Sequence, residues 1–356
     1  MRVAVLFGGR SAEHEVSILS ARYVAAMAAR RGHHVVLMAI DKWGRWWFDD
    51  VAERMLQEGP AAVPPPTGPV SPADRLPPWE RLAEVDIVFP VLHGPFGEDG
   101  TVQGLLEIAG VPYVGCGVTA SAVAMDKAVA KDLFRANRLP VLPYMVLVWE
   151  EVARWPHATI AEVEAQLSYP VFVKPANLGS SVGVSKVTHR DALWPALVEA
   201  GKYDRKIIVE QGIEAREIEV SILGNDHPRA SVPGEVIPGR EWYDYQAKYE
   251  DDATQLLIPA PLPAETATWV REMAITAFRA IDAAGMARVD FLMDRRTGDV
   301  YINEVNTIPG FTPVSMYPKL WEASGVPGDE LVDTLLHLGM ERHGQQAKNI
   351  EPDIVA

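Results

Sequence analysis

The order of apolar runs and glycine turns in the first forty residues constrains the fold of this chain most. An apolar run at 3–7 ends at Gly8-Gly9, and apolar residues then recur at helical spacing as far as Met27. A second apolar run covers 35–40. Two buried strands joined by a helix predict a parallel sheet, because parallel strands require a crossover connection. We therefore expect an α/β domain at the start of the chain, ending near residue 120.

A proline-rich segment interrupts this pattern. Eight prolines fall within residues 59–78, and each proline removes a backbone donor and fixes φ. Such a segment forms neither an α-helix nor a central strand, so we predict a surface excursion. Beyond it, apolar runs at 85–92 and 111–114 continue the strand pattern.

The rest of the chain predicts a mixture of helices and strands. Turn residues at 295–298 separate two apolar runs and indicate a hairpin. The expected elements are a helix at 121–138, strands at 171–174, 207–210 and 217–223, a helix at 270–284, hairpin strands at 288–293 and 301–305, and a helix at 331–339.

The charge of the chain argues against one broad class of function. There are 33 Lys and Arg residues against 48 Asp and Glu, which gives a net charge of −15, whereas nucleic-acid-binding proteins are usually basic. The single cysteine, Cys116, can form neither an intrachain disulfide nor a cysteine-rich metal site. This favours a reducing compartment, the cytoplasm. No apolar stretch approaches 18 residues, so we expect no membrane span.

Two glycine-containing loops are candidates for binding an anionic ligand. The first, at 8–17, places a glycine turn before a helix, whose N-terminus can bind a ligand. The alternative is that Glu15 and Ser17 only complement the helix dipole and cap the helix. In the second, Lys174 precedes a loop of small residues at 175–184, whose backbone N–H groups can approach a phosphate. The alternative there is an ordinary Gly-Ser hairpin loop.

A third pattern places acids on two paired strands. Residues two apart in a strand share a face, so Arg288 and Asp290 point one way, and Glu304 and Asn306 point one way. If the two faces coincide, two carboxylates and an amide converge beside a guanidinium. These hard oxygen ligands suit Mg²⁺ or Mn²⁺ bound to nucleotide phosphates. The alternative is a pair of solvated strand ends, but carboxylates beside apolar strands are costly without a cation, so the pattern favours a metal site.

Two further segments favour roles in a closed active site. Residues 306–316 directly follow the candidate metal ligands, and Gly310 is placed to offer a backbone N–H to a developing oxyanion. A plain Pro-Gly turn is the alternative. Residues 242–249 are polar and aromatic, which is typical of a mobile lid that excludes water. The alternative is a surface loop packed by its own aromatic side chains.

In this order, the motifs resemble the ATP-grasp superfamily and, more narrowly, the D-alanine–D-alanine ligase family. The resemblance covers about residues 1–340. It rests on Gly-Gly-x-Ser-x-Glu-His-Glu-Val-Ser at 8–17, Leu-His-Gly-x-x-Gly-Glu-Asp-Gly at 92–100, Gly-Ser-Ser-Val-Gly at 179–183, Tyr-Asp-Tyr-x-Ala-Lys-Tyr at 243–249, Arg-Val-Asp at 288–290 and Glu-Val-Asn-Thr-x-Pro-Gly at 304–310.

The resemblance implies a multidomain protein with α/β and α+β parts and an ATP-grasp fold. An N-terminal Rossmann-like domain, the preATP-grasp domain, is expected at 1–122. The central ATP-grasp subdomain is expected at 123–220. The C-terminal subdomain, with the lid loop and metal site, is expected at 221–345 and is followed by a tail at 346–356. ATP is then held between the last two domains.

The implied reaction is the ATP-dependent joining of two D-alanines to D-alanyl-D-alanine for peptidoglycan synthesis. The carboxylate of the first D-alanine becomes an acyl phosphate, and the amino group of the second displaces phosphate. The family also implies two Mg²⁺ or Mn²⁺ ions per site, activation by a monovalent cation, and a homodimer.

The resemblance implies a role for each residue that matches a family motif. Positioning and charge stabilisation dominate phosphoryl transfer, so no nucleophilic side chain is required. The implied ATP-binding residues are Lys127, Lys174, Ser180, Ser181, Glu210 (adenine), Gln211, Ile213, Glu217 (ribose), Lys248 (γ-phosphate) and Asn303, and the metal ligands are Asp290, Glu304 and Asn306. The implied catalytic residues are Glu15, Ser180, Tyr249, Arg288, Gly310 and Ser315, and the substrate-binding residues are Glu15 (first D-alanine ammonium), His93, Ser315 (second D-alanine carboxylate) and Met316.

Three alternatives stand beside this interpretation. A D-alanine–D-lactate ligase departs from the Lys-Tyr pair that this chain retains at 248–249. A non-catalytic nucleotide-binding protein is expected to have lost metal or phosphate residues, and all of those are present here. A nicotinamide oxidoreductase is suggested only by the N-terminal strand–helix–strand pattern, which lacks the dinucleotide glycine fingerprint.

Overall fold

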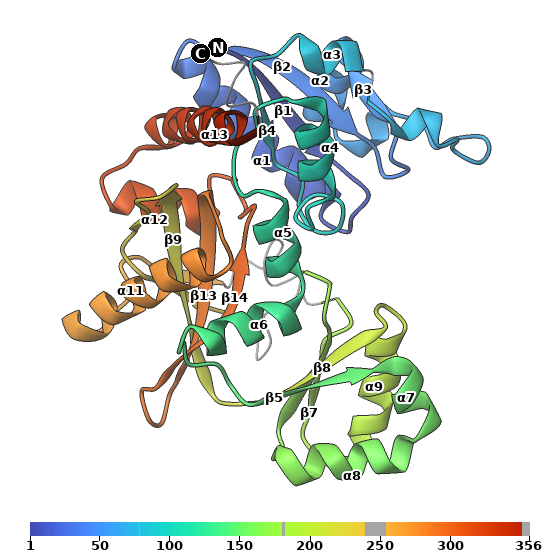
Figure 1. Ribbon diagram of the computed structural model, residues 1–356, viewed down its shortest axis with the longest axis vertical. Helices are drawn as coiled ribbons and strands as arrows, with labels where there is room; N and C mark the ends of the chain where they lie inside the picture. Colours follow the sequence, from blue (N-terminus) through green and yellow to red (C-terminus); the bar gives the residue numbers. More distant parts are fainter. Residues whose placement is uncertain (78, 180–181, 239–253, 351–356) are drawn as a thin grey trace.

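The computed structural model describes residues 1–77, 79–179, 182–238 and 254–350. Three sheets follow one another along the long axis of the molecule, with the N-terminal sheet at one end (Figure 1). Within the described ranges, no helix is both long enough and apolar enough to cross a bilayer.

The predicted parallel sheet is present at the N-terminus. Its elements are β1 (Arg2–Gly8), α1 (His14–Arg30), β2 (His34–Ile40), β3 (Trp46–Phe48), β4 (Ile87–Pro90) and α4 (Thr101–Ala109), joined by the last helix of the chain, α13 (Gly328–Ile350). β1 pairs in parallel with β2 and β4, and β3 adds an antiparallel edge. Helices α1 and α13 cover one face and α4 the other, so β1 is buried on both sides.

Two segments near this sheet were predicted with different success. Residues 59–77 form no α-helix or strand and contain two short 3₁₀ turns, Pro60–Ala62 and Ala73–Arg75, as the prolines require. They lie between α2 (Asp49–Glu58) and α3 (Trp79–Ala83). The expected strand at 111–114 is wrong, because the segment forms a single bridge between Val88 and Tyr113.

Two short helices, α5 (Val118–Met125) and α6 (Lys127–Ala136), lead out of this sheet where one helix was expected. The helix breaks at Asp126, whose backbone is extended at φ −85° and ψ 96°. The Asp126 side chain accepts hydrogen bonds from the backbone N–H groups of Ala128 and Val129. This is a standard N-cap, so α6 begins at Lys127.

The sheet at the opposite end of the molecule is antiparallel, in the order β5-β8-β6-β7. Helices cover one of its faces and form an apolar core with it. Its strands are β5 (Tyr144–Val148), β6 (Val171–Pro175), β7 (Ser185–Val187) and β8 (Lys206–Gln211), and its helices are α7 (Trp149–Arg154), α8 (Pro156–Gln166) and α9 (Leu193–Gly201).

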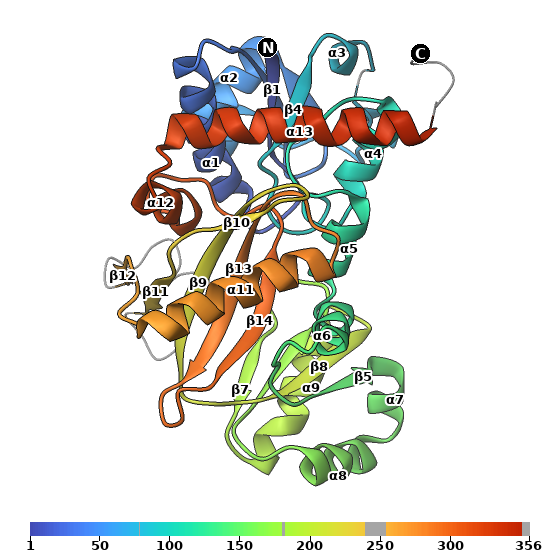
Figure 2. The ribbon, with the colours of Figure 1, turned by 60° about the vertical axis from the view of Figure 1, so that its left-hand side comes forward.

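The middle sheet is also antiparallel, in the order β12-β11-β9-β13-β14, with β10 paired to β9. The predicted hairpin is confirmed as β13 and β14. The elements are β9 (Ala215–Gly224), β10 (Arg229–Ala230), β11 (Gly234–Ile237), β12 (Gln255–Leu257), α11 (Ala264–Ala280), β13 (Gly285–Asp294), β14 (Val300–Asn306) and α12 (Met316–Ala323). The α11 helix begins six residues before its predicted start, and α13 extends into the predicted tail. Figure 2 shows α13 crossing between the N-terminal and middle sheets.

Candidate active site

Charged side chains from three neighbouring strands form a row across the middle sheet. Glu219 of β9 lies opposite Asp290 of β13, which in turn lies opposite Glu304 of β14. The same register puts Arg288 opposite Asn306. Residues directly opposite each other point to one face of a sheet, so the two faces of the hairpin coincide. The register also brings in Glu219, which the sequence interpretation missed.

Cations and an amide balance the acids of this row. Arg288 binds Asp290 through two nitrogen atoms, each 2.7 Å from a carboxylate oxygen. Asn306 Nδ2 donates to Asp290 Oδ2 at 2.9 Å. Nζ of Lys127, at the start of α6, lies 3.4 Å from Glu304 Oε2. The row is therefore a partly buried set of oxygen ligands whose negative charge is held by neighbouring cations.

A second charged group is buried between β6, β8 and α6. Glu210 is 3% exposed, and Lys174 Nζ donates to one of its oxygens at 2.5 Å while Lys131 contacts the other. Burial opposes ionisation, but the two ammonium groups lower the pKa of Glu210 to about 2. With both lysines protonated, this group carries a surplus positive charge that an anionic ligand can use.

Lys131 was not predicted as a site residue, although its spacing from Lys127 in the sequence indicates that it belongs there. It lies four residues after Lys127 and thus on the same face of α6. It is 1% exposed, and burial lowers the pKa of its ammonium group. A buried lysine needs a counter-charge, and Glu210 supplies it.

These two charged groups line one cavity of about 620 Å³, which we call the strand cavity. Its walls come mainly from β6, β8, β9, β13 and β14. All described residues that were predicted to bind ATP line it: Lys127, Lys174, Glu210, Gln211, Ile213, Glu217 and Asn303.

A second cavity of about 640 Å³, built mainly by loops, adjoins the first; we call it the loop cavity. The two cavities share Lys127, Gly179, Glu219 and Glu304 as wall residues. A ligand in one cavity therefore meets a ligand in the other beside Lys127 and Glu304. The predicted residues His93, Arg288, Gly310, Ser315 and Met316 line the loop cavity.

The structure contradicts the assignment of Glu15 to this cavity and places Glu13 there instead. Glu13 lines the loop cavity, and a methyl group at Gly94 would lie 3.0 Å from its Oε2. Glu15 lies on α1 with its carboxylate half exposed and bound to Lys42 Nζ at 2.6 Å. Residues two apart at a helix start point about 200° away from each other, so only one of them can face the cavity.

His93 ties the loops of this cavity together. Its Nδ1 donates to the carbonyl oxygen of Ile308 at 3.0 Å, and its Nε2 lies 3.1 Å from the hydroxyl of Ser20. The same hydroxyl oxygen accepts from the backbone N–H of Phe311 at 3.1 Å. Burial lowers the pKa of His93, which favours the neutral ring. Both ring nitrogens are engaged, so His93 positions the loops around the cavity.

Glu98 is a further residue that the sequence interpretation missed. Its carboxylate accepts from the backbone N–H groups of Gly94 at 2.7 Å and Ile308 at 3.2 Å. Burial and the nearby charge of Glu13 raise its pKa to about 8. Glu98 therefore joins the two loops that carry His93 and Gly310, and it is largely protonated at neutral pH.

Gly310 and Ser315 approach each other closely at the far end of the loop cavity. A methyl group at Gly310 would lie 2.9 Å from Ser315 Oγ, so a side chain at residue 310 requires the serine to move. Ser315 Oγ lies 2.7 Å from Thr312 Oγ1 and accepts from the Thr312 backbone N–H at 3.0 Å. Both residues line the loop cavity, so the absence of a side chain at Gly310 keeps the space beside this hydroxyl open.

Families described as "D-ala D-ala ligase N-terminus" and "D-ala D-ala ligase C-terminus" match residues 2–116 and 133–337 of this chain. The chain belongs to the D-alanine–D-alanine ligase family. The predicted ATP-grasp fold class and the resemblance to this family are confirmed. As a member of the family, the protein is a ligase.

Individual members of the D-alanine–D-alanine ligase family match the chain over nearly its whole length. D-alanine–D-alanine ligase from Heliobacterium modesticaldum is 52% identical, with 98% of this chain and 96% of that protein covered. Among solved structures, the D-alanine–D-alanine ligase of Coxiella burnetii is 34% identical with a TM-score of 0.80, covering 100% of this chain and 98% of that one. VanG D-Ala:D-Ser ligase from Enterococcus faecalis is 32% identical with a TM-score of 0.81, covering 95% and 99%.

Four of the residues assigned from the ligase family motifs lie outside the described ranges. They are Ser180, Ser181, Lys248 and Tyr249. Their roles stay predictions.

The residues assigned to metal binding fit a divalent cation of the kind that this ligase family uses. Asp290, Glu304 and Asn306 offer two carboxylates and an amide from one face of the hairpin. Among the residues that the structure describes, no three His, Cys, Asp or Glu side chains gather closely enough to hold a metal ion. Mg²⁺ is commonly bound by one or two carboxylates together with substrate phosphates, so this incomplete set suits an ion that arrives with a nucleotide.

Proposed function

We propose that the protein joins two D-alanines to D-alanyl-D-alanine at the expense of ATP, in the synthesis of peptidoglycan. The observation that carries this proposal is the meeting of the two cavities. The strand cavity is rich in lysine and carboxylate, and the loop cavity contains acid, arginine and a backbone N–H. They join at Lys127 and Glu304, where a phosphate donor on one side reaches an amino acid on the other.

The strand cavity is proposed to hold ATP. Lys127 and Lys174 neutralise phosphate oxygens, and Glu210 accepts from the adenine amino group. Lys174 is bound to Glu210 in the structure, so it must exchange this partner for a phosphate. Lys131 stays on Glu210 and keeps the carboxylate ionised during that exchange.

The remaining ATP contacts of the proposal come from the edges of the strand cavity. Gln211 and Ile213 line the base, Glu217 binds the ribose hydroxyls, and Asn303 lies beside the phosphates. The side-chain amide of Gln211 already donates to the carbonyl oxygen of Ser168 at 2.8 Å. We therefore expect Gln211 to offer its backbone to the base.

Asp290, Glu304 and Asn306 are proposed to hold two Mg²⁺ or Mn²⁺ ions. When bound, these ions would offset the negative charge of the phosphates and so allow a carboxylate to approach. The protein already supplies a balancing positive charge at the same acids through Arg288 and Lys127. With the ions bound, Arg288 and Lys127 would exchange Asp290 and Glu304 for the reacting groups.

In the first proposed step, the ammonium group of the first D-alanine is bound by Glu13, in place of Glu15. A carboxylate oxygen of this D-alanine attacks the γ-phosphorus of ATP. The bond from that phosphorus to the bridging oxygen breaks, and ADP leaves. Lys248 is predicted to reach the transferring phosphate. The product is an acyl phosphate and has a good leaving group on its carbonyl carbon.

In the second proposed step, the amino group of the second D-alanine attacks that carbonyl carbon. Arg288 and the Gly310 N–H stabilise the oxyanion of the tetrahedral intermediate, and Ser315 binds the carboxylate of the incoming substrate beside Met316. The intermediate expels phosphate, and the nitrogen loses a proton as the amide forms. Ser180 and Tyr249 are predicted to close the lid over these groups.

The remaining family expectations also belong to this proposal. We infer a homodimer and activation by a monovalent cation from the family resemblance alone. The division into parts at 1–122, 123–220 and 221–345 with a tail from 346 stays a proposal, but its boundary at 220 falls within β9 and its tail begins within α13. The single cysteine supports placing the reaction in the reducing cytoplasm.

The proposal is tested by phosphate release from ATP and Mg²⁺ with different acceptors. We expect phosphate with D-alanine but not with L-alanine, and a product with the mass of the dipeptide. D-serine and D-lactate are offered together with D-alanine as competing acceptors. A dominant mixed dipeptide or a depsipeptide would contradict the acceptor assignment, and ATP binding without turnover would contradict the reaction.

A further inference from the structure

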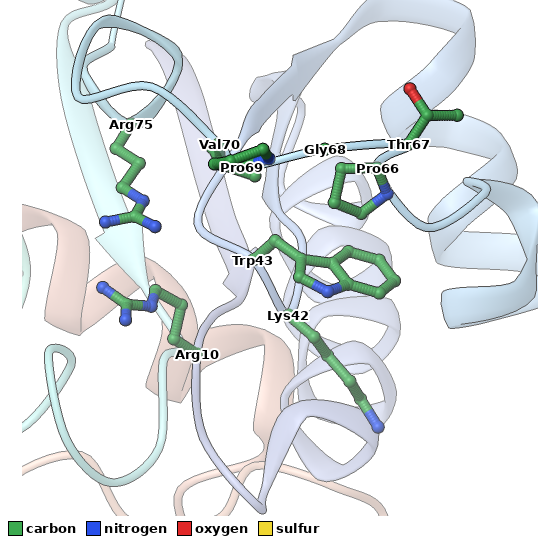
Figure 3. Close-up of a pocket in the computed structure, with 9 residues that line it drawn as sticks. All are labelled: Arg10, Lys42, Trp43, Pro66, Thr67, Gly68, Pro69, Val70 and Arg75. Atoms are coloured by element: carbon green, nitrogen blue, oxygen red, sulfur yellow. The ribbon is translucent and has the colours of Figure 1, made fainter.

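A pocket in the N-terminal domain shares no lining residue with the two cavities of the active site and has no role in the proposed reaction. Its nine lining residues, Arg10, Lys42, Trp43, Pro66, Thr67, Gly68, Pro69, Val70 and Arg75, enclose about 490 Å³ (Figure 3). We call it the arginine pocket. Three of these side chains are cationic and none is acidic, in a chain whose net charge is −15. One wall comes from the proline-rich segment.

Two guanidinium groups face each other across this pocket. Figure 3 shows Arg10 and Arg75 pointing toward one another from different segments of the chain. A methyl group at Gly44 would lie 2.8 Å from Arg10 Cδ and 3.4 Å from Arg75 Cγ, so the glycine keeps the space between them open. Gly44 has φ +91°, which a residue with a side chain rarely adopts.

The neighbouring acids do not neutralise this pair. Asp41 is bound by Arg45 and by the indole nitrogen of Trp47, and Asp74 is bound by Ser71. Glu15 holds Lys42, which points away from the two arginines. Within the described part of the chain, neither Arg10 nor Arg75 has an ion pair. Two like charges held together without a counter-charge favour an anionic ligand.

The backbone around both arginines is fixed. The carbonyl oxygen of Arg75, at the end of a 3₁₀ turn, accepts from the indole nitrogen of Trp46 at 3.1 Å. The guanidinium of Arg10 lies 4.8 Å from the centre of the Phe96 ring, and the N–H of Gly9 donates to Ile40 at 2.7 Å. The site is therefore held by segments that are distant in sequence and does not depend on one loop.

We propose that the arginine pocket binds the phosphate group of a small molecule between Arg10 and Arg75, with the apolar remainder of that molecule against Trp43 and the prolines. A phosphate monoester has three terminal oxygens and up to two negative charges, so it can accept paired hydrogen bonds from both guanidinium groups at once, whereas a carboxylate has two oxygens and one charge. The pocket gives the proline-rich segment a function as its outer wall.

The site is connected to the active site through a short segment. Ser11 follows Arg10 and donates to the backbone carbonyl of His93 at 2.7 Å, and its oxygen accepts from the N–H of Glu13 at 3.0 Å. A ligand that holds Arg10 therefore restrains the loop that carries Glu13. We infer that its binding changes the KM for D-alanine; this consequence rests on the proposed function, whereas binding itself does not.

Calorimetric titration of the full chain, with the strand cavity saturated by a non-hydrolysable ATP analogue and Mg²⁺, tests the binding. The probes are phenyl phosphate, inorganic phosphate and phenylacetate. We expect one site for phenyl phosphate, weaker binding of inorganic phosphate, and none of phenylacetate. Arg75→Met should weaken phenyl phosphate binding about tenfold, because a charge-assisted pair of hydrogen bonds is lost.

Arg154→Met is the matched control, since Arg154 is an exposed arginine on α7 whose ion pair, among the described residues, is with Glu150 on its own helix. It should leave the binding unchanged, and both variants should keep the thermal transition of the parent. Equal binding of phenyl phosphate by the parent and Arg75→Met would overturn the site. Equal affinities for inorganic phosphate and phenyl phosphate would contradict the proposed contact between Trp43 and the apolar part of the ligand. Binding of phenylacetate would contradict the preference for phosphate.

Discussion

The two walls of the active site are built in different ways. On the strand side, the acids and cations stand on β13, β14, β6 and β8, where the register fixes which side chains share a face. On the loop side, His93 donates to the carbonyl oxygen of Ile308, and Glu98 accepts from the N–H groups of Gly94 and Ile308, which joins the segments at 93–98 and 307–315. Ser11 donates to the carbonyl oxygen of His93 and joins the segment at 8–13 to them. The strand side was predictable from alternation. The loop side was not, and there Glu15 was chosen where Glu13 faces the cavity.

The charged groups of the two walls have different functions. On the strand side, acids and cations form ion pairs with one another, and a bound ligand would replace one partner of each pair. On the loop side, a neutral His93 and a largely protonated Glu98 hold segments together, and Glu13 is the acid proposed to bind the substrate ammonium. Substitutions should therefore affect catalysis most strongly on the strand side and at Glu13.

The largest effect is expected at the centre of the strand side. Glu304→Gln removes a charge at the proposed metal site, so kcat should fall on the order of 10³-fold or more. Asp299→Asn makes the same chemical change in the exposed turn of the same hairpin and should leave kcat unaltered. Initial rates of phosphate release provide the measurement. Full activity of Glu304→Gln would remove the metal assignment.

The same substitution at Glu13 and at Glu15 shows which of the two carboxylates binds the substrate. Glu13→Gln should lower kcat/KM for D-alanine by about 100-fold, because the substrate ammonium loses its counter-charge. Glu15→Gln should change it less than about twofold, since an exposed ion pair with Lys42 contributes little. A larger loss in Glu15→Gln would restore the assignment made from the sequence.

A substitution of Lys131 tests whether ATP binding requires Lys174 to leave Glu210 for a phosphate. In Lys131→Met, Lys174 alone must hold Glu210, so the KM for ATP should rise about tenfold. The free energy of unfolding should fall by about 2–3 kcal/mol, because a buried ion pair loses a partner. Lys202→Met, at an exposed lysine on a surface pair, is the control. An unchanged KM would show that Lys174 does not need Lys131 to release Glu210.

The smallest effect concerns stability on the loop side. The pKa of Glu98 is raised from 4.5 to about 8, so the folded protein binds more protons than the unfolded chain between these values. Stability from this group is full below pH 4.5 and is lost as the pH rises toward 8. Glu98→Gln should remove that slope and alter the change in Tm between pH 6 and pH 9 by roughly 2–4 °C. Parallel Tm profiles of the parent and the variant would contradict the raised pKa.

The sequence by itself determined the elements whose periodicity is strong. The strand–helix–strand start and the hairpin of β13 and β14 follow from periodicity and turn chemistry. Alternation put Arg288 with Asp290 and Glu304 with Asn306, and the register of the hairpin then showed that the two faces coincide. Lys174 was singled out from its place at a strand end before a glycine-containing loop, whereas the role of Lys127 came from the family resemblance and Lys131 was missed. Inferences from periodicity succeed because backbone geometry repeats within an element, so position in the element decides direction.

Only the tertiary structure decided which charges meet. The helix break at Asp126 turns Lys127 toward Glu304, and Lys131 reaches Glu210 from a helix 79 residues away in the chain. The residues next to Glu98 and Arg75 in the sequence do not indicate which distant segments these two residues contact. Their roles arise from contacts between distant segments, and the free energy of a buried charge depends on everything that surrounds it, which no local pattern contains.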